Sequence, residues 1–284
     1  MSKRLENLMF VRELGAGNGT RCALMKDVTD QKLYCKKSVA ATAPNWKSQV
    51  RQLKNEFDVG VNNNHAALRK SLEYGIVKRK FRPIEAYNIL AYVDGIPLDK
   101  FAESSPLKLV LKIFFHAADG LLELHRRGFV HADLKPQNIL CAKNGRPTII
   151  DFGQACPILH KKERIQGTEN FIAPEQVERR PLDQRTDVFG LGATMHKVLL
   201  GRHIETALNR KTGGNLSVDR LRANPLFNGE PLDPILIKLI DDCCADDRQD
   251  RPNSMQLVKD RLELSFERLG NSAASGSTSA SAAG

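Results

Sequence analysis

The sequence predicts an α+β protein in which a small β-rich part comes first and a larger, mainly helical part follows. Residues 1–40 alternate strand-like runs with turns, whereas the apolar residues after Leu107 recur at helical spacing. The hydrophobic share of 41% over 284 residues is ordinary for a globular chain with a packed core. The chain is therefore expected to hold two regions of different secondary structure.

The β-rich part is expected to contain early strands and one main helix. The strand-like runs are residues 10–14, 22–25 and 32–39. A helix is predicted over residues 45–61, because Val50, Leu53 and Phe57 fall on one helical face. This part therefore reads as a sheet with a single long helix beside it.

The second part begins with a long apolar-periodic helix over residues 107–127, which Gly128 can cap at its C-terminus. Asn144-Gly145 is a hairpin signal. The short strands beside that turn are residues 139–141 and 148–150, and further helices are expected near 185–200, 233–245 and 253–268. Residues 271–284 are almost all small, so we expect a disordered tail there.

The formal net charge of +10 has two interpretations. The favoured one is a solvated surface, and the alternative is attraction to acidic peptides, nucleic acid or anionic lipid. The aromatic-basic interleaving of nucleic-acid binders is missing, so no specific nucleic acid is predicted. No apolar run approaches the roughly 20 residues that span a bilayer, so no membrane span is predicted.

The six cysteines and the first residues bear on location. The cysteines lack the spacing of a metal site, and Cys243 and Cys244 are adjacent, so reduced thiols are expected. The start of the chain lacks an apolar signal core. We therefore expect a cytoplasmic protein. The sequence does not indicate an oligomeric state.

Two short runs carry the chemistry. Residues 131–138 read His-Ala-Asp-Leu-Lys-Pro-Gln-Asn, and residues 151–153 read Asp-Phe-Gly. Phosphoryl transfer needs a base to orient a hydroxyl, oxygen ligands for magnesium, and cations against developing negative charge. The residues that supply this set are Asp133, Lys135, Asn138 and Asp151. Both runs in order, joined by a strand-turn-strand, are a strong indication of this chemistry.

With these runs the chain resembles a eukaryotic-type (Hanks-type) Ser/Thr protein kinase, a family also found in bacteria. The resemblance extends from about Leu14 to about Leu264. It implies a bilobal protein kinase fold with a small β-rich N-lobe, a larger mainly helical C-lobe, and ATP and Mg²⁺ as cofactors. The kinase domain is expected over residues 8–268, with the N-lobe at about 8–93 and the C-lobe at about 96–268.

The resemblance also implies the catalytic roles. Asp133 would orient or deprotonate the hydroxyl of a Ser or Thr in a protein substrate, and Lys135 would steady the transferred phosphoryl group. Asn138 and Asp151 would hold magnesium. His131 is expected to be a packed structural residue.

A glycine-rich turn allows backbone N–H groups to approach phosphates. The residues expected there are Gly15, Ala16, Gly17, Asn18 and Gly19, with Cys22 beside them. Relatives usually have glycine at position 20 and valine at position 22, where this chain has Thr20 and Cys22. Taken alone, such a cluster is more often an ordinary hairpin turn, and its place before the strand lysine favours the nucleotide role.

Two adjacent lysines compete for the phosphates. Strand side chains alternate between faces, so the residue two before the lysine shares its face and must leave room for adenine. That residue is the small Cys35 for Lys37 and the bulky Tyr34 for Lys36. The prediction is therefore Lys37, with Cys35 in the adenine pocket.

The lysine needs a carboxylate partner, and Glu56 in the predicted helix is the candidate. Its alternative is a solvated helix glutamate. Gly60, one turn later, stands where relatives usually have an apolar residue, which predicts a weakened helix end. Leu90 is the expected gatekeeper, and backbone groups of Ala91 and Val93 are expected to bind adenine.

The peptide-positioning loop is matched by residues 167–175. Thr168 would hydrogen-bond Asp133 and Lys135, as in Ser/Thr-specific members. Glu175 would form a buried ion pair with Arg251. Asp187 is expected to brace the backbone of the catalytic loop.

The activation switch of many relatives is missing here. Ala132 stands where phosphorylation-switched relatives have an arginine, and residues 154–166 contain no Ser, Thr or Tyr. We therefore predict activity that is independent of activation-loop phosphorylation. Two alternatives stay open: a pseudokinase that acts as a binding or scaffold module, and a small-molecule phosphotransferase.

Overall fold

The computed structural model describes residues 3–17, 19–208 and 226–276. The chain divides into two units. The first unit holds Met1–Asp94 together with Ile150–Ala155, and the second holds Gly95–Ile149 and Cys156–Gly284. The sequence placed residues 150–155 in the C-lobe, whereas the structure groups them with the first unit.

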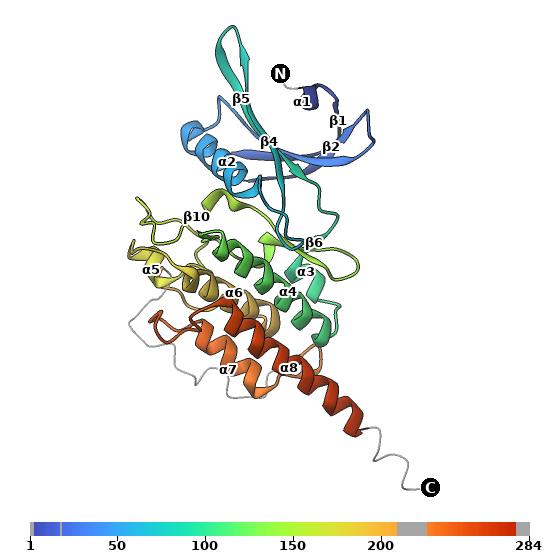
Figure 1. Cartoon of the computed structure of the whole chain (residues 1–284), viewed down its shortest axis with the longest axis vertical. Coiled ribbons are helices and arrows are strands. Elements are labelled where there is room, and N and C mark those ends of the chain that lie inside the picture. The colour runs from blue at the N-terminus through green and yellow to red at the C-terminus, as the bar shows by residue number, and fades with distance from the viewer. Residues whose placement is uncertain (1–2, 18, 209–225, 277–284) are drawn as a thin grey trace. The chain divides into compact units, whose positions relative to one another are not determined.

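The first unit is built on a five-stranded antiparallel sheet of order β1-β2-β3-β5-β4 (Figure 1). A short α1 (Lys3–Glu6) precedes it. The strands are β1 (Leu8–Gly17), β2 (Thr20–Asp27), β3 (Leu33–Ala40), β4 (Ser71–Arg79) and β5 (Arg82–Ala91). The predicted runs 10–14 and 22–25 lie within β1 and β2, and the run 32–39 matches β3 to within one residue at each end. Strand β4 was not predicted.

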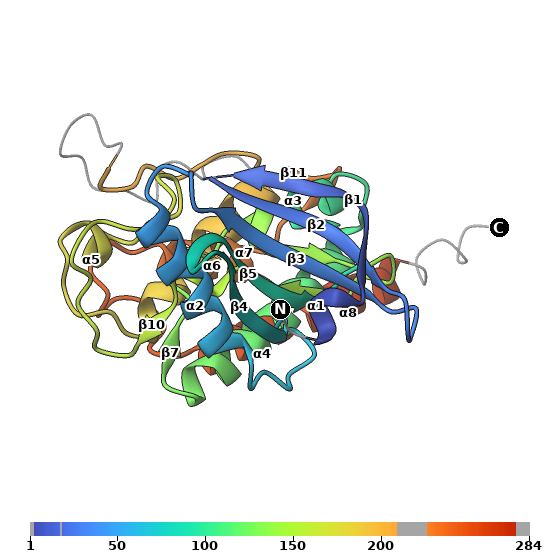
Figure 2. The same cartoon turned by 90° about the horizontal axis from the view of Figure 1, so that it is seen from above.

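Helix α2 (Trp46–Gly60) packs beside this sheet, as Figure 2 shows. Its Leu53 is buried with Val39 and Ala86 of the strands. Gly60 is buried too, and a Cβ there would lie 2.4 Å from Ser71 Oγ. The glycine therefore permits close approach of β4, which explains why an apolar side chain is missing at this position.

The second unit is mainly helical (Figure 1). Its helices are α3 (Leu98–Ala102), α4 (Leu107–Arg126), α5 (Pro174–Val177), α6 (Gln184–Leu200), α7 (Pro234–Cys243) and α8 (Met255–Gly276). Its short strands are β6 (Ile96–Pro97), β7 (Phe129–Val130), β8 (Ile139–Cys141), β9 (Pro147–Ile149), β10 (Cys156–Pro157), β11 (Leu226–Phe227) and β12 (Glu230–Pro231). The predicted α+β class is confirmed.

The core of the second unit forms around α4 and α6. The apolar face of α4 is fully buried, with Phe114 and Leu121 at 0% exposure. The α4 face packs against α8. Helix α6 is buried around most of its circumference, including Asp187 and Phe189. A carboxylate in such a helix must find partners inside the protein.

The end of α8 differs from the sequence prediction. The helix continues to Gly276, so residues 271–276 of the tail predicted to be disordered are helical, and residues 277–284 lie outside the described range. Alanine has the highest helix propensity, and extending an existing helix needs no new nucleation. Within the described residues, no helix combines the length and hydrophobicity needed to cross a bilayer.

Candidate active site

In the first unit, Lys37 on β3 has two carboxylate partners. Its Nζ lies 2.9 Å from Glu56 Oε2 and 2.8 Å from Asp151 Oδ1. Lys36, on the other face of the strand, pairs instead with Glu85 at 2.8 Å. The predicted alternation therefore places Lys37, and not Lys36, beside the predicted partner glutamate.

The ion pairs also set the charge states. Burial lowers the pKa of Lys37, but the carboxylates of Glu56 and Asp151 outweigh burial and raise that pKa above the ordinary lysine value. Burial raises the pKa of Asp151, while Lys37 and its hydrogen bond lower it more, so the pKa lies below its usual range. Near neutral pH both groups are therefore charged.

Arg69 is a partner of Glu56 that the sequence reasoning missed. It is 8% exposed, and its Nη2 lies 2.6 Å from Glu56 Oε1. Each oxygen of the fully buried Glu56 thus has its own cation, Arg69 on one side and Lys37 on the other. The only sequence signal was a cation directly after the apolar run 66–68.

The Asp-Phe-Gly segment is bound to helix α2. Asn55 Nδ2 donates to the carbonyl oxygens of Phe152, Gly153 and Ala155 at 3.0, 3.2 and 2.8 Å. Asp151 lies in the left-handed region and is the N-cap of the short 3₁₀ helix η2 (Phe152–Gln154), and its Oδ1 accepts from the Gly153 N–H. These bonds explain why residues 150–155 belong to the first unit.

The glycine-rich turn joins β1 to β2. Gly15 and Gly19 have φ of 155° and 80°, which glycine tolerates best. Thr20 Oγ1 donates to the Gly17 carbonyl at 2.8 Å, so the threonine closes the turn. Asn18, predicted to contact phosphate, lies outside the described residues. Ala16 is an exposed residue of β1.

The predicted adenine wall lies on three neighbouring strands. Cys22 stands opposite Lys37 in the register, and Cys35 stands opposite Leu90. Cys35 and Leu90 are both buried. The Ala91 N–H donates to the Lys70 carbonyl at 2.9 Å. Val93 follows β5 and is partly buried.

In the second unit, the catalytic loop residues meet at Thr168. Thr168 Oγ1 donates to Asp133 Oδ1 at 2.8 Å and accepts from Lys135 Nζ at 2.7 Å. Asn138, in the 3₁₀ helix η1 (Pro136–Asn138), donates from Nδ2 to the Asp133 carbonyl at 2.8 Å. The contacts predicted for Thr168 are therefore present.

Asp187 holds the loop backbone from helix α6. It accepts from the N–H groups of His131 and Ala132 at 2.8 and 2.9 Å, and it bonds His125 Nε2 at 2.8 Å. Burial raises the pKa of Asp187, but the bond to His125 and the other partners lower it below the ordinary value. This bracing position matches the sequence prediction.

The predicted ion pair between Glu175 and Arg251 is present. Arg251 Nη1 and Nη2 donate to the two oxygens of Glu175 at 2.9 and 3.0 Å. Both side chains are buried, at 4% exposure for Glu175 and 0% for Arg251. Such a bidentate pair fixes the end of the segment 167–175.

Gln176 is a second residue that the sequence reasoning missed. Its Nε2 donates to the carbonyl oxygens of Ala132 and Gln166 at 2.8 and 3.0 Å, and its Oε1 accepts from the Ala173 N–H. One buried amide therefore joins the catalytic loop, the segment before Thr168 and helix α5. A glutamine in this position carries no local motif that would have identified it.

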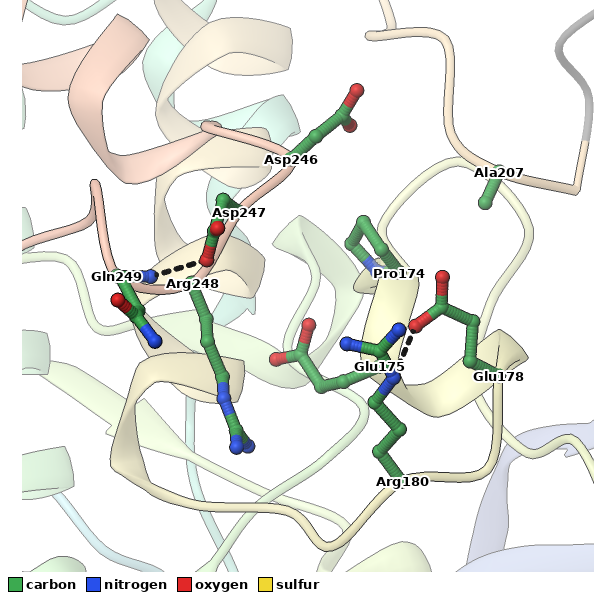
Figure 3. Close-up of a pocket in the computed structure, with 9 residues that line it drawn as sticks. All are labelled: Pro174, Glu175, Glu178, Arg180, Ala207, Asp246, Asp247, Arg248 and Gln249. Atoms are coloured by element: carbon green, nitrogen blue, oxygen red, sulfur yellow. Dashed lines mark hydrogen bonds and ion pairs between the residues drawn. The ribbon is translucent and has the colours of Figure 1, made fainter.

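A surface pocket of about 400 Å³ is lined by residues of α5 and by residues 246–249 (Figure 3). Its charged groups have partners of their own: Arg180 pairs with Glu178 at 2.8 Å, and Arg248 lies 3.6 Å from Asp183. The catalytic-loop residues do not line it. We assign no ligand to this pocket.

Comparison with known proteins identifies the family of the chain. Residues 8–262 match the protein kinase domain family, so the chain belongs to that family. The resemblance inferred from the motifs is confirmed.

Among curated relatives, the serine/threonine-protein kinase PknB of Mycolicibacterium smegmatis is 26% identical over 66% of this chain and 31% of its own length. The kinase nekl-2 of Caenorhabditis elegans is 32% identical over 58% of this chain and 46% of its own length. The kinase PkaA of Streptomyces coelicolor is 30% identical over 60% of this chain and 33% of its own length. The chain thus matches from 31% to 46% of the length of these relatives.

Proposed function

We propose that this chain is an active serine/threonine protein kinase that transfers the γ-phosphoryl group of ATP to protein hydroxyls. The observation that carries the proposal is the Thr168 hydroxyl held between Asp133 and Lys135. This arrangement keeps a carboxylate and a cation together at the place where a substrate hydroxyl must be oriented.

The donor atoms suit magnesium. Asn138 uses its amide nitrogen on the Asp133 carbonyl, which leaves its amide oxygen for a metal. Asp151 accepts a hydrogen bond from Lys37 with Oδ1, which leaves Oδ2 for a metal. Magnesium takes such oxygen ligands together with nucleotide phosphates, and it would neutralise phosphate charge when bound. We propose Asn138 and Asp151 as its ligands.

The remaining roles follow from the charge states. Lys37 stays protonated and would bind the phosphates, with Glu56 holding its ammonium in place. Asp133 would orient the substrate hydroxyl and receive its proton. Lys135 would stabilise the charge that develops on the transferred group.

We propose further that activity does not require phosphorylation of the activation loop. Where relatives pair an arginine with a phosphate, Ala132 offers only its backbone, and Gln176 binds that carbonyl together with Gln166. Glu56 is held by Arg69 inside the first unit. In this proposal, hydrogen bonds and ion pairs within the protein replace the contacts that a phosphate makes in relatives that are switched by phosphorylation.

The location is proposed on chemical grounds. All six cysteines are free thiols, which suits a reducing compartment. We therefore propose a cytoplasmic protein that acts on protein substrates there.

One assay tests the function. Phosphatase-treated protein should transfer labelled phosphate from magnesium-ATP to a mixed Ser/Thr peptide library, and Asp151→Asn should abolish transfer while leaving the fold intact. A folded wild-type protein that binds ATP without turnover would make it a pseudokinase. Turnover only of small molecules would indicate a small-molecule phosphotransferase. Activity only after rephosphorylation of Thr168 would disprove the proposal that activity is independent of activation-loop phosphorylation.

A further inference from the structure

The turn between β4 and β5 carries a concentrated positive charge around one aromatic side chain. We call Lys78, Arg79, Lys80, Phe81 and Arg82 the hairpin tip. All five residues are exposed, and Phe81 is 96% exposed, the highest value among the large hydrophobic side chains described. The proposed kinase reaction makes no use of them.

The hairpin tip lies beyond the body of the sheet. Strand β5 pairs with β3 only over residues 85–91, whereas its pairing with β4 continues to Arg79 and Arg82. The last part is therefore a two-stranded ribbon, and Figure 1 shows the hairpin projecting from the sheet. Side chains on such a ribbon are accessible from both faces.

The tip sequence is locally unfavourable for folding. Arg79 and Arg82 stand directly opposite each other, and like charges in that position are destabilising. The two turn residues, Lys80 and Phe81, have φ of 48° and 66°, a geometry for which Asn-Gly is preferred. Residues that break several local rules at once are expected at functional places.

The four cations also lack internal partners. In the described part of the chain, none of them has a carboxylate within ion-pair distance. The nearest acidic residues on the two strands are engaged, Glu85 with Lys36 and Glu73 with the Tyr87 hydroxyl. The tip therefore presents four uncompensated positive charges.

We propose that the hairpin tip docks on an anionic lipid membrane. The phosphate and carboxylate groups of the lipids would pair with the cations, and the Phe81 ring would enter the boundary between headgroups and acyl chains. The proposed cytoplasmic location supplies such a surface, because the cytoplasmic leaflet is rich in anionic lipid.

The shape of the tip favours a membrane over an acidic peptide. A peptide-binding site needs a groove that encloses the peptide, but Phe81 stands at the end of a ribbon with exposed neighbours on both strands. A lipid surface can instead close around a projecting ring from all sides. The charge complementarity is satisfied by any anionic bilayer without a shaped pocket.

Co-sedimentation of the full chain with vesicles tests the proposal. Binding is expected to phosphatidylcholine vesicles that contain phosphatidylserine and not to pure phosphatidylcholine. Raising salt from about 0.1 M to about 1 M shortens the screening length from roughly 10 Å to 3 Å and should weaken binding strongly.

Two variants locate the binding on the tip. Phe81→Ser should lower the vesicle affinity about tenfold. The combined variant K78Q, R79Q, K80Q and R82Q should lower it at least about a hundredfold, because each basic side chain near an anionic surface contributes about fivefold. Both variants should keep the turnover of the parent protein on a soluble peptide.

Matched controls separate the tip from overall charge. The combined variant K47Q, R51Q, K112Q and K143Q removes the same number of charges from other exposed positions, and Leu264→Ser removes another exposed apolar side chain. Both controls should bind vesicles like the parent.

Three outcomes would overturn the proposal. One is a parent protein that does not bind phosphatidylserine vesicles at low salt. Another is equal loss of binding in the tip and control variants, which would indicate net charge alone. The third is tight binding of a polyglutamate peptide to the tip without vesicle binding, which would assign the surface to an acidic protein.

Discussion

Two buried ion-pair clusters, one in each unit, differ in how many of their polar atoms have hydrogen-bond partners among the described residues. In the second unit, the five N–H donors of Arg251 make five hydrogen bonds, two of them to Glu175. In the first unit, Glu56 is shared between Arg69 and Lys37, and Arg69 Nε has no hydrogen-bond partner among the described residues.

From this difference we expect the Glu175–Arg251 pair to serve stability and the Glu56 cluster to serve activity. A fully bonded pair stabilises one arrangement, and removing either partner leaves an isolated buried charge. A shared carboxylate can tolerate the loss of one cation because the other remains. The first cluster should therefore affect activity more than stability, and the second should do the reverse.

The largest expected effect is on the lysine of the first cluster. Lys37→Met should lower kcat/KM at least about a hundredfold, because it removes the cation proposed to bind the phosphates. Lys36→Met, which breaks the pair with Glu85, is the matched control and should stay within about threefold of the parent. Steady-state kinetics with magnesium-ATP measures both, and the reverse ranking would refute the assignment.

Arg251→Met should destabilise the protein strongly. It leaves Glu175 buried without its bidentate partner, which costs about 3–5 kcal/mol of unfolding free energy. Chemical denaturation monitored by circular dichroism gives this value. A loss below about 1 kcal/mol would show that the Glu175–Arg251 pair contributes little to stability.

Arg69→Met should change activity more than stability. Glu56 keeps Lys37 as a partner, so the loss of unfolding free energy should be smaller than for Arg251→Met. The KM for ATP should rise, with kcat/KM falling about tenfold, since Glu56 is less firmly positioned. Arg69→Lys should recover part of the activity. Unchanged kinetics with a large stability loss would make the two clusters equivalent.

The smallest expected effect is on the reactivity of two thiols, Cys22 near the first cluster and Cys243 near the second. A hydrogen bond from Cys35, helped by Lys37 and Arg69, lowers the pKa of Cys22 to about 7. Burial raises the pKa of Cys243 to about 12 despite nearby arginines. The thiolate is the reactive form and grows as pH rises, so alkylation of Cys22 should increase through pH 7.

Mass spectrometry after brief iodoacetamide treatment at neutral pH should find Cys22 modified at least about a hundredfold faster than Cys243. Arg69→Met should move the midpoint of the Cys22 reaction to higher pH, because one of the cations that lower its pKa is removed. Equal labelling of both cysteines would contradict the difference in charge environment.

Local patterns predicted much of this protein. The strands before residue 40, helix α2 and helix α4 follow from residue periodicity, which depends only on neighbours along the chain. The alternation of strand side chains was enough to choose Lys37 over Lys36. The motif runs identified the residues around Thr168 because each has a recognised spacing.

Amino-acid sequence alone thus determined the fold class, the kinase family and the residues of the motifs. Only the tertiary structure decided that Arg69 pairs with Glu56, that Gln176 binds the Ala132 and Gln166 carbonyls, and that Gly60 makes room for Ser71. The physical reason is that these contacts join residues from different segments, and burial gives them their strength. An arginine or glutamine has no local signature until folding places a partner beside it.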